Sequence, residues 1–203
     1  MSDIKVARGA RIIFQGDSIT DAGRCYDDDS QLGLGYPNMI AAWLSARYPS
    51  QEFTFINRGV SGNRIYDMES RWTEDCIALQ PDLVSILIGI NDTWRRYDSD
   101  LLSPIAEFEE SYRRLLDRLR TETDTQILLL EPFVLPTPQD RERWREDLDP
   151  RIGAVRRVAR DYHLPLLPLD GLFAAAAAKR EPEFWAADGV HPTQAGHALI
   201  SQA

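Results

Sequence analysis

The chain has 203 residues, 43% of them hydrophobic, which is enough to bury a sizeable core, and we expect one domain over residues 1–203. Its net charge is −9 and its basic residues form no block, which disfavours nucleic acid and anionic membranes as partners. No segment resembles a signal peptide or a membrane span, so a cytoplasmic protein is expected. The two cysteines, Cys25 and Cys76, exclude a disulfide scaffold, and the sequence shows no metal-ligand cluster, so neither metal nor cofactor is expected.

Five apolar runs have the length of strands, and the segments between them have helical periodicity. The expected strands cover 11–15, 53–57, 83–88, 126–131 and 164–169. Expected helix faces carry Ile40, Trp43, Leu44 and Tyr48; Ile65, Met68, Trp72, Cys76 and Leu79; Ile105, Phe108, Tyr112, Leu115 and Leu119; and Ile152, Val155, Val158 and Tyr162. Alternating strands and helices predict an α/β fold, a three-layer α/β/α sandwich around a five-stranded parallel sheet of the flavodoxin-like type.

The first apolar run ends abruptly in polar residues. Residues 12–14 are Ile, Ile and Phe, and Gly16, Asp17 and Ser18 follow almost at once. A strand buried on both faces is a continuous apolar run, and such sheets bind ligands at the C-terminal edge. We therefore expect Ser18 on that edge, where a neighbouring base would make it a nucleophile.

Two further strand ends carry residues that suit an oxyanion hole. The stretch NRGVSGN at 57–63 follows the second run, and its glycines allow a backbone N–H to approach a ligand. The stretch GIND at 89–92 follows the third run, so that the Asn91 amide can point to the same place as the N–H groups of Ser18 and Gly62. Alone, each stretch is a weak signal, because Gly and Asn also mark ordinary turns.

The segment PFVLPTPQDRERWREDL at 132–148 is the one long irregular stretch. Segments of this length are often functional or mobile, but a solvated connection that runs into an early helical turn explains it equally well. Its role stays open.

The base that Ser18 requires is found near the C-terminus, in DGVHPTQAGH at 188–197. Gly189 allows a tight turn that folds the Asp188 carboxylate onto His191 Nδ1 and leaves Nε2 free for Ser18. Pro192 fits the first turn of a following helix. His163 ends a helical pattern and His197 lies within the last helix, so structural roles explain both better.

These stretches resemble, in order, the four sequence blocks of the SGNH hydrolases, or GDSL-type esterases: GDSIT at 16–20, SGN at 61–63, GIND at 89–92 and DGVH at 188–191. The resemblance covers nearly the whole chain. It implies Ser18 as nucleophile, His191 as base and Asp188 as its orienting carboxylate. It also implies oxyanion donors in the Ser18 N–H, the Gly62 N–H and the Asn91 side chain. Ile19 replaces the leucine of the family name, a conservative change.

Within the family, RIYDMESRW after Asn63 and the stretch IGINDTWRRYD look most like bacterial cytoplasmic acetylxylan esterases and related carbohydrate acetylesterases. Trp94, Tyr97 and Trp185 stand near the blocks, where aromatic faces can bind a sugar, although packing explains tryptophans at such places as well. The resemblance is also compatible with a homo-oligomer. The sequence ends at Ala203, soon after the expected last helix begins, which leaves a truncated C-terminus as one interpretation.

The hypothesis is therefore a cofactor-free serine esterase that removes acetyl groups from carbohydrate esters such as acetylated xylo-oligosaccharides. A lysophospholipase or thioesterase with the same residues is the alternative within enzymes. A carbohydrate-binding protein on a hydrolase scaffold would not require all five block residues. A flavodoxin-like nucleotide-binding protein would have the same three-layer α/β/α architecture, but the sequence has neither a GxGxxG nor a Walker A motif.

Overall fold

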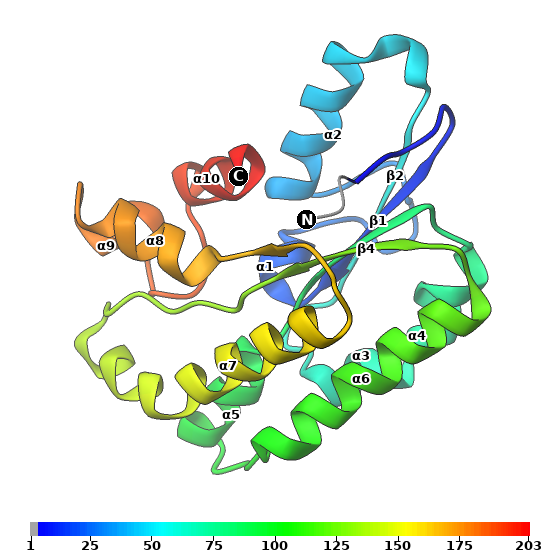
Figure 1. The fold of residues 1–203 in the computed structure, drawn as a ribbon. Helices are drawn as coiled ribbons and strands as arrows, with labels where there is room; N and C mark the ends of the chain where they lie inside the picture. The colour runs from blue at the N-terminus through cyan, green and yellow to red at the C-terminus, as the bar shows by residue number, and fades with distance from the viewer. Residues whose placement is uncertain (1–3) are drawn as a thin grey trace.

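The computed structural model describes residues 4–203 and contains a sheet of five parallel strands (Figure 1). Its strands lie in the order β2-β1-β3-β4-β5, so β1 has neighbours on both sides. The strands are β1 (Arg11–Gly16), β2 (Thr54–Gly59), β3 (Leu83–Leu87), β4 (Gln126–Leu130) and β5 (Leu166–Leu167). The predicted α/β fold with a five-stranded parallel sheet is confirmed.

Helices cover both faces of the sheet (Figure 1). The α-helices are α1 (Ser18–Asp21), α2 (Tyr36–Arg47), α3 (Ile65–Ser70), α4 (Trp72–Asp75), α5 (Ile90–Asp98), α6 (Ile105–Glu122), α7 (Arg145–Asp161), α8 (Leu169–Ala177), α9 (Pro182–Trp185) and α10 (Gln194–Gln202). Three 3₁₀ turns join them, η1 (Pro49–Gln51), η2 (Ile77–Leu79) and η3 (Gln139–Trp144). Within residues 4–203, no helix is both long and apolar enough to cross a bilayer.

The core has two parts, one on each face of the sheet, because successive side chains of a strand point to opposite faces. Ile13 of β1 packs with residues of α3, α4, α6 and α7. Its neighbours Ile12 and Phe14 pack on the other face, with residues of α2, α8 and α10. Both sides of β1 are thus buried, and its polar C-terminal end is the part left for chemistry.

Two predicted elements are shorter than expected. The fifth strand was predicted over 164–169, but only Leu166 and Leu167 pair, because Pro165 and Pro168 on either side have no N–H to donate to a ladder. The apolar stripe from Ile65 to Leu79 does face the core, but over α3, α4 and η2 in succession. The hydrophobic spacing predicted which side chains are buried there, but it did not predict that the helix is broken into three elements.

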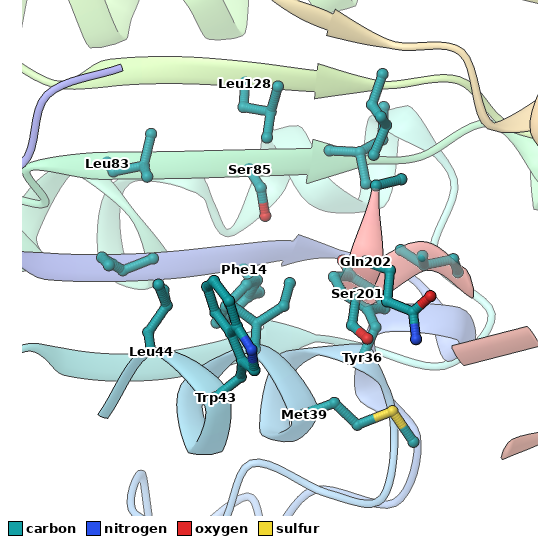
Figure 2. A pocket seen from close by; sticks show the side chains of 16 residues that line it. Phe14, Tyr36, Met39, Trp43, Leu44, Leu83, Ser85, Leu128, Ser201 and Gln202 are labelled. Atoms are coloured by element: carbon teal, nitrogen blue, oxygen red, sulfur yellow. The ribbon is translucent and has the colours of Figure 1, made fainter. Parts of the chain in front are cut away.

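An apolar groove of about 620 Å³ lies on the sheet face between α2 and the end of α10 (Figure 2). Phe14, Leu83 and Leu128 of the sheet form its floor, and Trp43 of α2 forms part of its wall. Ser18, Asp188 and His191 are not among the residues that line it. The groove is therefore separate from the strand ends where the sequence motifs meet.

Candidate active site

The nucleophile predicted from the sequence stands at the junction of β1 and α1. Asp17 caps α1, since its carboxylate accepts the Ile19 N–H at 3.0 Å. Ser18 is the first residue of the helix and is only partly buried. Its Oγ lies 2.9 Å from His191 Nε2. The structure thus places the serine hydroxyl within hydrogen-bond reach of an imidazole 173 residues further along the chain.

A tight turn joins Asp188 to His191, as predicted. Asp188 Oδ2 lies 2.7 Å from His191 Nδ1, while Oδ1 accepts the backbone N–H groups of Val190 at 3.0 Å and His191 at 2.7 Å. Gly189 in this turn has a φ of +81°, which favours glycine. The prediction for Pro192 was wrong: α10 begins two residues later, at Gln194, where the Thr193 hydroxyl caps it.

Hydrogen bonding sets the charges of this pair. Partial burial would raise the pKa of Asp188, but the hydrogen bonds from the His191 ring and from the His191 and Val190 N–H groups outweigh it and hold the pKa far below its usual value. The bond to Asp188 in turn raises the pKa of His191, against partial burial and the charge of Arg141, which lower it. Asp188 is therefore anionic and favours a proton on His191 Nδ1, which leaves Nε2 to accept one from Ser18.

The residues predicted as oxyanion donors flank Ser18 on both sides. Gly62 follows β2 and Asn91 follows β3, and these are the two neighbours of β1 in the sheet. Gly62 has a φ of +82°, and Asn91 is buried with its Nδ2 donating to the Asn63 carbonyl at 3.1 Å. The side chain of Asn91 thus ties the loop that carries Gly62 to the start of α5.

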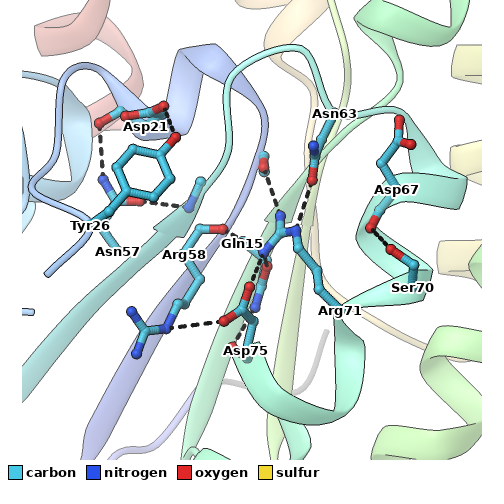
Figure 3. A network of polar contacts seen from close by, with 12 residues as sticks. Gln15, Asp21, Tyr26, Asn57, Arg58, Asn63, Asp67, Ser70, Arg71 and Asp75 are labelled. Atoms are coloured by element: carbon cyan, nitrogen blue, oxygen red, sulfur yellow. Dashed lines mark hydrogen bonds and ion pairs between the residues drawn. The ribbon is translucent and has the colours of Figure 1, made fainter.

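A polar network that was not predicted from the sequence supports the Gly62 loop (Figure 3). Asp21 accepts the N–H of Ser61 at 3.1 Å and its hydroxyl at 2.7 Å. Arg71 donates to the Asn63 side chain at 2.7 Å, to the Arg58 carbonyl at 2.9 Å and to Asp75 at 2.8 Å. These bonds fix the loop between α1 and α4. Apart from the i,i+4 pair of Arg71 and Asp75, they join residues too far apart in sequence for a local pattern to reveal.

Two carboxyl groups beside the site are fully buried. Asp92 accepts the Ile65 N–H at 3.1 Å and the Ser103 hydroxyl at 2.9 Å, and burial raises its pKa to about 6. Burial also raises the pKa of Asp17 to about 7, and its second oxygen has no hydrogen-bond partner. A carboxylate buried without full hydrogen bonding destabilises the fold, and here it lies next to Ser18 in the chain.

Asp17→Asn is expected to stabilise the protein at alkaline pH. Because the folded state holds the Asp17 proton more tightly than the unfolded chain, stability from this group falls as the pH rises from about 4 to about 7. Asparagine keeps an oxygen for the Ile19 N–H but cannot ionise. Relative to the unchanged protein, the free energy of unfolding of the variant should rise by on the order of 4 kcal/mol between pH 4 and pH 8.

Urea denaturation at the two pH values measures this difference. Asp21→Asn is the matched control, because hydrogen bonds from Ser61 and Tyr26 outweigh burial and lower the pKa of Asp21. The contribution of Asp21 to stability therefore changes only below about pH 4, and the stability difference for this variant should be nearly the same at pH 4 and pH 8. Equal stability differences at pH 4 and pH 8 for Asp17→Asn would contradict the burial argument.

The three aromatic residues predicted near the substrate do not share one place. The Trp94 ring lies beside the His191 ring, with centroids 5.7 Å apart. Tyr97 instead stacks on Trp144 at 5.5 Å. Trp185 packs edge-on against Phe184 at 5.0 Å and donates its indole N–H to the Arg180 carbonyl. Only Trp94 of the three contacts the Ser18, His191 and Asp188 group among the described residues.

The remaining histidines and the two cysteines are not part of the Ser18, His191 and Asp188 group. His197 is buried, stacks on Tyr36 and accepts the Tyr36 N–H at Nδ1, 3.2 Å away. His163 follows the end of α7. Cys76 is buried and Cys25 is partly buried, and both are free thiols. Over residues 4–203, no group of three or more His, Cys, Asp or Glu side chains is arranged to hold a metal ion.

Known proteins share this fold and sequence. An acetylxylan esterase of Geobacillus stearothermophilus is 33% identical over 98% of this chain and 94% of its own. A crystal structure of the acetylxylan esterase from that organism matches with a TM-score of 0.89 and 32% identity over 98% of this chain and 94% of the other. The structure of a Parabacteroides merdae protein described as a GDSL-like lipase matches with a TM-score of 0.95 and 32% identity. The match covers 99% of this chain and 96% of the other. The model of the GDSL-like lipase/acylhydrolase family matches residues 14–199, and this chain belongs to that family.

Proposed function

We propose that this protein is a serine esterase that removes acetyl groups from carbohydrate esters. The observation that carries the proposal is the chain of contacts from Ser18 Oγ to His191 Nε2, 2.9 Å, and from His191 Nδ1 to Asp188, 2.7 Å. Nucleophile, base and orienting carboxylate at these distances form the arrangement that activates a serine for acyl transfer. Family membership and the acetylxylan esterase relatives support the same reaction class.

The reaction then proceeds in two halves. Ser18 Oγ bonds to the acetyl carbon while His191 Nε2 takes the hydroxyl proton, and the imidazolium gives that proton to the sugar oxygen as the ester bond breaks. Water attacks the acetyl-enzyme with the same base, which releases acetate and frees the serine. We assign stabilisation of the oxyanion to the N–H groups of Ser18 and Gly62 and to the Asn91 amide.

A sugar acetate suits the surroundings of this site better than a long acyl chain. The His191 side chain is 45% exposed, and Trp94 offers an aromatic face directly beside it. Near Gly62 lie the guanidinium of Arg95 and the polar residues Asn63 and Arg64, which form no continuous apolar wall. The large apolar groove is lined by other residues, so it offers no channel for an acyl chain bound to Ser18.

The substrate proposal predicts a preference for short acyl groups. The specificity constant kcat/KM should fall by at least about 10-fold from p-nitrophenyl acetate to the octanoate, because within the described residues no apolar channel at Ser18 binds the added methylenes. In an enzyme with such a channel each buried methylene adds about 0.8 kcal/mol, and the order is reversed. Acetate release from acetylated xylo-oligosaccharides is the direct assay.

The control is Ser18→Ala protein purified in the same way, which reports contaminating esterases. A rise in kcat/KM from acetate to octanoate, or turnover of lysophospholipid with none of the acetylated sugar, would replace the carbohydrate proposal by the lysophospholipase alternative. The serine mechanism would survive that result.

A further inference from the structure

The segment between β4 and α7 runs alongside the turn that carries Asp188 and His191. We define the catalytic turn as residues 188–191. Leu135 donates its N–H to the Gly189 carbonyl at 2.8 Å, and Arg141 donates its Nε–H to the Asp188 carbonyl at 3.3 Å. A β-carbon on Gly189 would lie 2.2 Å from the Thr137 carbonyl oxygen, so the two backbones are in close contact. The long segment of undetermined role thus supports the catalytic turn.

Arg141 joins the Asp188 backbone to the tryptophan beside His191. Its side chain is only 14% exposed, and its guanidinium lies over the rings of Trp144 at 4.1 Å and Trp94 at 5.0 Å. Trp94 is the residue whose ring flanks His191. Arg141 therefore reaches both ends of the catalytic turn, the Asp188 backbone directly and the His191 ring through Trp94.

We propose that Arg141 is a positioning residue that holds the Asp188–His191 pair in line with Ser18. A planar guanidinium can stack on two indole rings and donate in its own plane at the same time, which a lysine ammonium cannot do. His191 is exposed, so few other contacts restrict its ring. This inference rests on the proposed function, because alignment of the pair matters for turnover only if the pair is catalytic.

Arg141→Gln should therefore lower kcat for p-nitrophenyl acetate by about 10- to 100-fold, the loss expected when a catalytic group is misplaced by about 1 Å. KM should stay within about twofold, because the residue does not contact substrate. Arg141→Lys should not restore kcat. The matched control is Arg143→Gln, which removes the same charge from the same 3₁₀ turn at an exposed side chain and should leave kcat unchanged.

A double-mutant cycle separates positioning from a general effect on the fold. In an Asp188→Asn background the carboxylate to be aligned is gone, so Arg141→Gln should cost less than about threefold in kcat. A purely structural role predicts the same fold-loss in both backgrounds. An equal fold-loss in both backgrounds would overturn the proposal. So would full recovery of kcat in Arg141→Lys, or an unchanged kcat in Arg141→Gln.

A readout that is independent of turnover distinguishes this proposal from the proposed function. The proton on His191 Nδ1, shared with Asp188, should give a downfield proton NMR signal that disappears in Asp188→Asn. Arg141→Gln should broaden or remove the signal, and Arg143→Gln should keep it. An inactive protein with this pattern would refute the esterase and retain the positioning role. An active protein whose signal persists in Arg141→Gln would refute the positioning role alone.

Discussion

Ser18→Ala is expected to abolish ester hydrolysis, with a loss in kcat of about 10⁶-fold, because removal of the nucleophile of a comparable triad costs that much. The mutation deletes one oxygen from a partly exposed side chain, whose hydroxyl contacts His191. The fold should survive, since Ile19 and Asp17 still form the start of α1. Initial rates on p-nitrophenyl acetate, with circular dichroism to verify folding, measure the effect.

Ser61→Ala is a suitable control for this experiment, because it too removes a single hydroxyl at the end of a strand, yet the Ser61 N–H to Asp21 remains. We expect a loss far smaller than that of Ser18→Ala. Turnover of the purified Ser18→Ala protein within about 10-fold of the unchanged enzyme could not be reconciled with a covalent mechanism at Ser18.

His191→Ala is expected to lower kcat by about 10⁶-fold, and Asp188→Asn by about 10⁴-fold. The histidine moves the proton, whereas the carboxylate orients the imidazole and stabilises its charge. Asp188→Asn keeps one oxygen that can accept the N–H groups of Val190 and His191, so the turn should stay folded. Kinetics on p-nitrophenyl acetate at saturating substrate compare the two variants.

The pH dependence of the same enzymes gives a second test. His191 must be neutral to act as base, so kcat/KM falls as the pH drops through its pKa. Asp188 raises that pKa, which places the acidic limb above the ordinary histidine value of 6.5. Asp188→Asn should move the limb to lower pH. Equal losses in both variants, with the limb unmoved, would show that Asp188 acts only by holding the turn together.

The positions of the residues proposed to react were the part of the molecule most open to prediction from the sequence. Continuous apolar runs marked the buried strands, and the parallel sheet brings the C-terminal ends of β1, β2 and β3 to one edge. Ser18, Gly62 and Asn91 stand at those three ends. The short spacing of Asp188 and His191 allowed the turn to be predicted, because its geometry is local.

The supporting residues were out of reach of this reasoning for a physical reason. Arg141 meets the Asp188 carbonyl across 47 residues, and Arg71 reaches the Arg58 carbonyl and Asn63 from the turn between α3 and α4, which has no distinctive motif. An arginine in a charged stretch is normally a solvated side chain, and only the folded chain shows which one is buried against tryptophans. Tyr97 and Trp185 illustrate the converse, since proximity in sequence to a motif did not place their rings beside His191.

The central claim, that Ser18 is the activated nucleophile, is tested most directly by covalent labelling. A fluorophosphonate reacts with a serine only where a base and an oxyanion site activate it. After incubation and proteolysis, mass spectrometry should find the adduct on the peptide that contains Ser18, at one equivalent per chain, and none on His191→Ala protein. An active enzyme that carries no adduct at Ser18, or an adduct on another residue that tracks the loss of activity, would contradict the account.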